Sequence, residues 1–206
     1  MLKIGITGGI GSGKTTVCKI FEILGIPVYY ADQRAKWLMV HDTELITEIK
    51  KLLGEDAYFE NGALNRKYIA NIIFSDKQKL AGLNALVHPA VGRDGERWHA
   101  AQKDVPYTLK EAAIMFESKS HLLLDKVITV SAPLELRISR VIARDGVDRA
   151  TVEARIKEQM SEEERIERSD FVIYNDGKRS LVLQVVELHK ELKKKREISI
   201  SQRWKR

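Results

Sequence analysis

A glycine-rich run near the start of the chain has the residue types and spacing of a phosphate-binding loop. Gly8-Gly9-Ile10-Gly11-Ser12-Gly13-Lys14-Thr15 fits the pattern G-x-x-x-x-G-K-[ST]. Glycines let successive backbone N–H groups curl around phosphate oxygens, and the lysine adds a full positive charge at the β- and γ-phosphates. We therefore expect a bound nucleoside triphosphate, with Mg²⁺ ligated by the Thr15 hydroxyl. The loop residues expected to hold the nucleotide are Gly11, Ser12, Gly13, Lys14, Thr15 and Thr16, and Lys14 is also expected to be catalytic.

A carboxylate after the second predicted strand could supply the other chemical group that phosphoryl transfer needs. Such transfer requires in-line positioning, neutralised charge and, in most enzymes, a carboxylate that takes the acceptor's proton. Asp32 follows the predicted strand 27–30, and strand ends of this kind face the ligand crevice of a doubly wound sheet. We assign Asp32 as the catalytic base or acceptor-orienting group. The alternative is that Asp32 only caps the following helix.

Arginines on a later predicted helix could neutralise phosphate charge. Arg140 and Arg144 lie four residues apart and therefore share a helical face. Asp148 is expected to cap a second helix, and Ser161-x-x-Glu164 is a capping box for a third. Two short charged helices around a turn at 145–146 predict a mobile lid over 140–167, and lids of this kind exclude water during transfer. We expect both arginines to bind the nucleotide and Arg140 to be catalytic. The alternative is a solvated helix pair in which Arg144 is paired with Asp145 or Glu153.

The elements around these residues predict an α/β fold. Gly25 suits the left-handed turn after the helix that follows the loop. Glycine-rich turns also close ordinary βα units, but a strand before the loop and a helix after it favour phosphate binding. Strands that alternate with helices indicate a parallel sheet covered on both faces, here a three-layer α/β/α arrangement with five strands. The predicted strands are 3–7, 27–30, within 105–115, 126–130 and 169–175, and the main core helices are 16–24, 134 onward and 178–195.

The segment 33–102 is too long for a simple crossover and reads as a helical insertion. Asp42 and the pair Ser75-x-x-Gln78 mark predicted helix starts. Pro89 disfavours helical angles at the residue before it, so His88 is expected at a helix boundary. From spacing alone, a capping or surface role for this histidine is the more ordinary interpretation.

The length and composition of the chain limit the classes of protein to which it can belong. The 206 residues, 44% hydrophobic and 31% charged, suit one globular core with an inserted subdomain. No apolar run is long enough to span a bilayer, no signal peptide precedes the loop, and the single Cys18 cannot form an internal disulfide. We expect a cytoplasmic monomer that acts on small molecules without membrane or nucleic acid. The net charge of +6 gathers in the tail 190–206, which is typical of a solvated helix end.

An ordered set of motifs resembles the dephospho-coenzyme A kinase family over nearly the whole chain. The set begins with the opening strand and loop and continues with Tyr30-Ala31-Asp32, His88-Pro89 and Phe116-Glu117. It ends with Arg140, Arg144-Asp145, Gln159 and the run from Ser169 through Asn175-Asp176-Gly177.

The resemblance implies ATP-dependent phosphorylation of the ribose 3′-hydroxyl of dephospho-coenzyme A, the last step of coenzyme A synthesis. It implies a nucleotide-binding core (1–32, 103–139 and 168–206), a coenzyme-A-binding insertion (33–102) and a lid (140–167). ATP and Mg²⁺ are the implied cofactors. Asp32, His88 and Glu117 are the implied acceptor-site residues, and Asn175 is expected near the base of ATP.

The chain departs from the family pattern before Phe116. The family carries an Asp and then Pro-Leu-Leu, where this chain has Glu111 and then Ala113-Ile114-Met115. Glu111 retains a carboxylate that could hold the metal through water. Two alternatives stay open, namely a nucleoside or nucleotide kinase on the same P-loop core and a nucleotide-controlled protein that binds RNA through its basic tail.

Overall fold

The computed structural model describes the backbone of residues 1–203 and the side chains of residues 1–194. The chain divides into two compact units, Met1–Tyr30 with Ala101–Arg206 and Ala31–Ala100. Within the described residues, none of the helices combines the length and the apolar character that a membrane crossing requires. The tail beyond residue 194, where part of the basic charge lies, is outside the described side chains.

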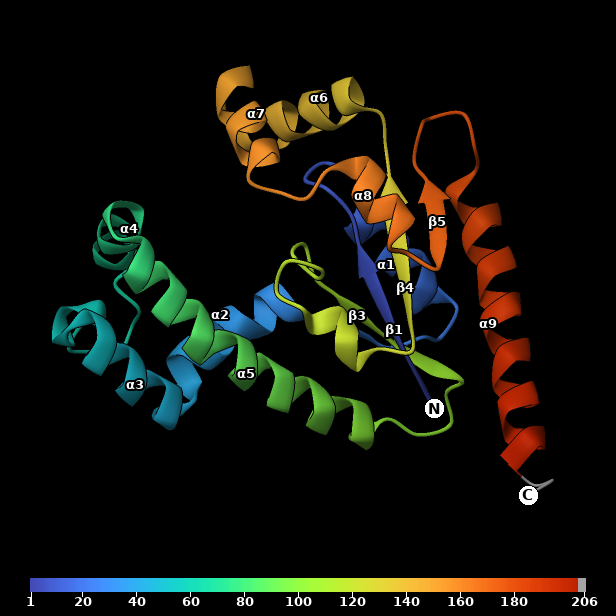
Figure 1. Ribbon diagram of the computed structural model, residues 1–206, viewed down its shortest axis with the longest axis horizontal. Helices are drawn as coiled ribbons and strands as arrows, with labels where there is room; N and C mark the ends of the chain where they lie inside the picture. Colours follow the sequence, from blue (N-terminus) through green and yellow to red (C-terminus); the bar gives the residue numbers. More distant parts are fainter. Residues whose placement is uncertain (204–206) are drawn as a thin grey trace. The chain divides into compact units, whose positions relative to one another are not determined.

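The first unit contains a five-stranded sheet in the order β2-β3-β1-β4-β5 (Figure 1). All four strand pairs are parallel, as predicted. The central strand β1 pairs with β3 on one edge and with β4 on the other. The strands are β1 (Leu2–Thr7), β2 (Val28–Tyr30), β3 (Tyr107–Glu111), β4 (Lys126–Ser131) and β5 (Phe171–Tyr174).

Two helices cover one face of this sheet. Helices α1 (Lys14–Ile23) and α9 (Leu181–Arg203) form one apolar cluster with the strands. The apolar residues of these strands and helices are buried because a parallel sheet has helices over its faces, which removes their side chains from water. The cluster includes Phe21, whose ring meets Tyr107 edge-on, and the Tyr107 hydroxyl is 2.7 Å from His189 Nδ1 on α9.

The opposite face carries α8 (Glu162–Glu167) against β4 and the segment 112–124, which ends in the short 3₁₀ helix η2 (Ser120–Leu123). Gly5 has no room for a side chain because Met115 and Leu124 pack against it. Layers on both faces confirm the predicted three-layer α/β/α fold.

The predicted lid, 140–167, belongs to the first unit and covers the second half of α6 together with α7 and α8 (Figure 1). Helix α6 (Leu134–Asp145) ends at Gly146, whose φ of 66° favours glycine. Asp148 accepts from the Thr151 N–H to cap α7 (Arg149–Lys157), and Ser161 accepts from the Glu164 N–H to cap α8. Both predicted caps are confirmed.

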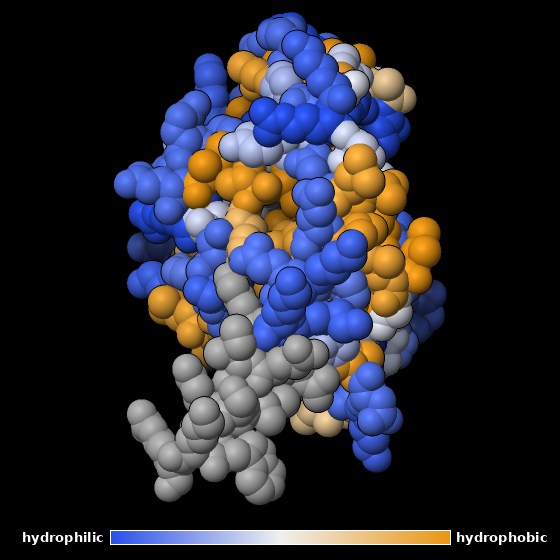
Figure 2. All heavy atoms as spheres, turned by 90° about the vertical axis from the view of Figure 1, so that its right-hand side faces the viewer, coloured by the Kyte–Doolittle hydropathy of each residue, from blue (hydrophilic) through white to orange (hydrophobic). Residues whose placement is uncertain are grey.

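Exposed apolar side chains occur on the outside of this unit. Ile23, Val182 and Leu183 on α1 and α9 are each more than half exposed. On the side that faces the viewer in Figure 2, apolar patches lie among hydrophilic side chains. Exposed apolar residues are ordinary on folded domains, so these residues call for no partner.

The second unit is helical, as predicted for the insertion. It contains α2 (Ala31–His41), α3 (Thr43–Leu53), the 3₁₀ helix η1 (Glu55–Ala57), α4 (Arg66–Ser75) and α5 (Lys77–Ala101). The Arg34 guanidinium donates two bonds of 2.8 Å to Asp94 and so joins α2 to α5. Asp42 accepts from the Leu45 N–H at the start of α3, which confirms that helix start.

Two predictions about this unit are wrong. The Ser75 hydroxyl donates to carbonyls at the end of α4, and Asp76 instead accepts from the first N–H groups of α5. An aspartate one residue later offers a charged acceptor at the better position. Helix α5 also continues through Pro89, so His88 lies inside a helix and not at its boundary. Buried Leu83, Val87, Ala90 and Val91 on both sides of the proline stabilise the helix enough to offset the lost hydrogen bond.

Candidate active site

The glycine-rich loop joins the central strand β1 to the start of α1. Gly13 is the N-cap of α1, with φ of 94° and no side chain to cap the helix. The first-turn N–H groups of an uncapped helix form a site for an anion, which the helix dipole strengthens. Gly11 has φ of 77°, and a Cβ on Gly13 would collide with Asn175 Nδ2. The backbone at these two positions therefore favours glycine, through the positive φ at both and the close approach of Asn175 at Gly13.

Lys14 reaches back across the loop. Its Nζ donates to the Gly8 carbonyl at 2.9 Å and lies 4.0 Å from Glu111 Oε1. Both side chains are nearly buried, which strengthens the attraction between their charges. One turn along α1, burial raises the pKa of the Cys18 thiol, with the charge of Glu111 as a second cause. The thiol is fully buried and protonated, as a packed side chain would be.

The donor set around Lys14 fits a magnesium ion that the nucleotide brings with it. The Thr15 side chain is exposed, and Glu111 ends β3 with only 8% of its surface exposed. Among the described residues, no three or more His, Cys, Asp or Glu side chains form a group that could hold a metal ion. Mg²⁺ keeps several waters and phosphate oxygens and needs few protein ligands, so Thr15 and Glu111 are compatible with the predicted site, which stays a prediction.

Arg140 and Asn175 contact the loop at the carboxyl end of the parallel sheet. Asn175 Nδ2 donates to the Ser12 carbonyl at 2.8 Å, and Asn175 Oδ1 accepts from Arg140 Nη2 at 3.1 Å. Arg140 Nη1 lies 3.4 Å from the Gly11 carbonyl. The structure thus brings together two residues that the sequence predicted separately, and it places a positive charge beside the proposed phosphate site.

Arg144 makes a different contact. Its guanidinium donates to both carboxylate oxygens of Asp145, at 2.7 and 3.0 Å, and Arg155 donates to the same carboxylate at 3.1 Å. The exposed ion pair between Arg144 and Asp145 is one of the two pairings considered in the alternative interpretation of a solvated helix pair. Its binding to ATP stays a prediction.

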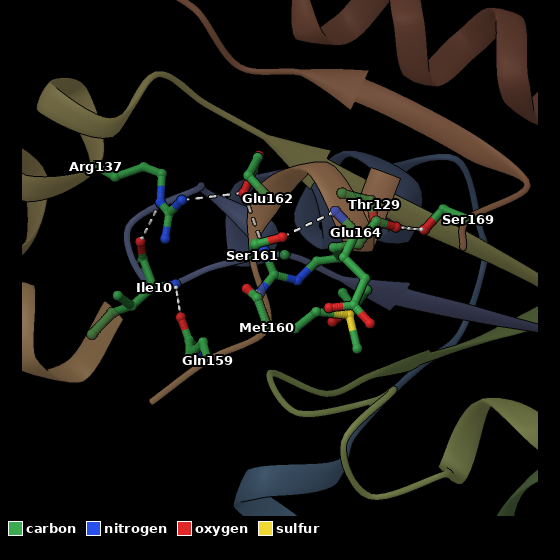
Figure 3. Close-up of polar contacts among 12 residues, drawn as sticks. Ile10, Thr129, Arg137, Gln159, Met160, Ser161, Glu162, Glu164 and Ser169 are labelled. Atoms are coloured by element: carbon green, nitrogen blue, oxygen red, sulfur yellow. Dashed lines mark hydrogen bonds and ion pairs between the residues drawn. The ribbon is translucent and has the colours of Figure 1, made fainter. Parts of the chain in front are cut away.

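Sequence reasoning missed two side chains that contact the loop directly. Gln159 Oε1 accepts from the Ile10 N–H at 2.9 Å, and Arg137 Nε donates to the Ile10 carbonyl at 3.0 Å (Figure 3). Arg137 lies one turn before Arg140 on α6, so its spacing gave a signal that the prediction did not use. Gln159 follows α7, and the sequence indicated it only as one of the motifs that carry the family resemblance, without a contact to the loop.

Glu117 lies near the same part of the lid. Its Oε1 accepts from the Met160 N–H at 3.0 Å, between α7 and α8. The preceding segment, which departs from the family pattern, is ordered: the Ala112 N–H donates to the Ile6 carbonyl, and Met115 is fully buried. An acceptor-binding role for Glu117 stays a prediction.

The second unit carries the other two predicted acceptor-site residues. Asp32 lies in the first turn of α2 and is exposed. An acidic side chain is favourable at a helix N-terminus, so the structural interpretation of Asp32 stays open beside the catalytic one. His88 is exposed on α5. The roles of both residues stay predictions.

Comparison with known proteins identifies the family. The sequence matches the family described as Dephospho-CoA kinase over residues 2–180. Dephospho-CoA kinase of Bacteroides fragilis is 38% identical over 187 residues, 91% of each chain. TT1252 from Thermus thermophilus is 35% identical with a TM-score of 0.80, covering 91% of this chain and 95% of that one. Dephospho-CoA kinase from Campylobacter jejuni is 25% identical with a TM-score of 0.69, covering 93% and 97%. The chain belongs to the dephospho-CoA kinase family.

Proposed function

We propose that this chain transfers the γ-phosphoryl group of ATP to the ribose 3′-hydroxyl of dephospho-coenzyme A, which completes coenzyme A. One observation carries the proposal above the others. The family match spans residues 2–180 and includes a phosphate loop whose helix begins uncapped at Gly13. ATP phosphates supply the negative charge that this helix start and Lys14 bind.

The chain's own groups divide the work of the reaction. Lys14 and the loop N–H groups hold the β- and γ-phosphates, and Arg140 adds positive charge where negative charge develops during transfer. Thr15 and, through water, Glu111 would hold Mg²⁺, which neutralises phosphate charge when bound. Asp32 acts as the general base that takes the proton of the attacking hydroxyl.

The remaining assignments belong to this same proposal. Residues 33–102 bind the acceptor, and the acceptor contacts His88 in this segment and Glu117 outside it. Residues 140–167 form the lid, which carries Arg144. Asn175 lies near the base. We also expect the protein to be cytoplasmic and monomeric and to bind neither membrane nor nucleic acid. These points remain predictions.

An acceptor comparison tests the proposal. ADP release from ATP and Mg²⁺ would be measured with dephospho-coenzyme A and, in parallel, with AMP, CMP and nucleosides. We expect the highest kcat/KM with dephospho-coenzyme A. Faster turnover of a nucleotide or nucleoside would contradict it and would favour the other kinase class considered above.

A further inference from the structure

Both backbone polar groups of Ile10 in the phosphate loop are bound by side chains that lie more than 120 residues away in the sequence. Gln159 accepts from the N–H of Ile10, and Arg137 donates to the carbonyl of the same residue (Figure 3). The two bonds measure 2.9 and 3.0 Å, which is ordinary hydrogen-bond geometry. The N–H belongs to the Gly9–Ile10 peptide and the carbonyl to the Ile10–Gly11 peptide, so the two bonds fix two consecutive peptide units.

Arg137 is itself fixed by a buried ion-pair network. It is only 4% exposed, and its Nη1 donates to Glu162 Oε2 at 3.1 Å. The same oxygen accepts from Arg165 Nη1 at 3.1 Å, and Arg165 Nη2 donates to the Met160 carbonyl at 2.6 Å. Two guanidinium groups therefore share one carboxylate, which leaves Arg137 little freedom to turn away from the loop.

Two glycines of the loop lie so close to Arg137 that a side chain at either position would collide with it. A Cβ on Gly9 would collide with the Arg137 guanidinium, and a Cβ on Gly11 would collide with the Arg137 backbone carbonyl. The loop and this arginine are thus packed without space between them. This close packing agrees with the hydrogen bond from the same arginine to the Ile10 carbonyl.

We propose that Gln159 and Arg137 are positioning residues that hold the two peptide units on either side of the Ile10 Cα in the orientation in which the loop binds phosphate. A carbonyl turned toward the phosphates would repel them. Arg137 holds the Ile10 carbonyl, and Gln159 holds the Ile10 N–H and, because the peptide is planar, the Gly9 carbonyl with it. The inference rests on the proposed function only in taking ATP as the ligand. Neither residue needs to touch the nucleotide, because each acts through the loop backbone.

Gln159 gives the cleaner test because it is only partly buried, so a substitution there preserves the fold. Gln159→Met keeps the length of the side chain and removes the acceptor, while Gln159→Glu retains an oxygen that can accept from Ile10. Glu158→Met is the matched control, since Glu158 is the exposed neighbouring residue. Binding of a fluorescent ATP derivative and hydrogen exchange of the Ile10 amide would be measured on the full chain.

In Gln159→Met we expect the Kd for the ATP derivative and the exchange rate of the Ile10 amide each to rise about tenfold, the effect of leaving one donor unpaired. Gln159→Glu should retain slow exchange at Ile10, and Glu158→Met should match the wild type in both measurements. The inference is overturned if Gln159→Met leaves either quantity within about twofold of the wild type, or if Glu158→Met changes them equally.

These measurements separate the inference from the proposed function. Neither of them requires phosphoryl transfer or any acceptor. If the wild type fails to phosphorylate dephospho-coenzyme A while the Gln159 series behaves as expected, the proposed acceptor is wrong and the positioning role stands.

Discussion

Replacing Gly13 with alanine tests whether the phosphate loop depends on the backbone form described above. Gly13 has φ of 94°, where an alanine costs about 1 kcal/mol or more. The added Cβ also displaces Asn175 Nδ2, which bonds to the Ser12 carbonyl. Moving Asn175 disturbs its 3.1 Å bond to Arg140 as well. Each of these two bonds contributes about 1 kcal/mol, so the total cost is about 3 kcal/mol.

Gly25→Ala provides a control at the other end of the same helix. Gly25 has φ of 79°, and no atom lies within 4 Å of the position of an added Cβ. This variant therefore carries the backbone strain without the collision, about 1 kcal/mol. At about 3 °C per kcal/mol for a chain of this size, we expect Tm to fall by about 3 °C in Gly25→Ala and by about 9 °C in Gly13→Ala.

Two assays on the pair distinguish local from general effects. Thermal unfolding without nucleotide gives the two values of Tm, and calorimetric titration with ATP and Mg²⁺ gives the affinities. We expect Gly13→Ala to bind ATP at least about tenfold more weakly, while Gly25→Ala binds normally. If the two variants lose the same stability and the same affinity, the contact between Gly13 and Asn175 has no importance for the loop and our reasoning fails.

Two further outcomes follow from the site and the core. Asp32→Asn should lower kcat by about 100-fold or more and leave the ATP affinity within a few-fold, since it removes an acid–base group; steady-state kinetics with an unchanged kcat would exclude that role. Burial, with the charge of Lys193 as a second cause, lowers the pKa of His189 below 6.5. The folded state then binds fewer protons than the unfolded state, so stability is complete above pH 6.5 and falls as the pH drops through the lowered value. Thermal scans at pH 7.5 and 5.5 should show a smaller loss of Tm in His189→Gln than in the wild type, and equal losses would refute the linkage.

Local patterns in the sequence predicted the features that depend on neighbouring residues. The phosphate loop, the parallel strands and the caps at Asp42, Asp148 and Ser161 each follow from a few consecutive residues. Such signals act within one turn or one strand, so they survive folding with little change.

The features that sequence reasoning missed depend on contacts between distant residues. Pro89 disfavours a helix locally, yet buried side chains on both sides keep α5 continuous. The bonds from Arg137 and Gln159 to Ile10 cross more than 120 residues of sequence. No spacing rule relates those positions, because their proximity arises only when α6 and the segment after α7 pack beside the loop.

The central position of β1 has a consequence for how the core opens. A strand paired on both edges cannot separate from the sheet without breaking two ladders, whereas an edge strand such as β2 breaks one. Local fluctuations therefore begin at the margins of the sheet and reach the middle last. The nucleotide loop directly follows β1, the strand that separates last from the sheet. Thermal fluctuations therefore open other segments of the sheet before they reach the expected ATP site.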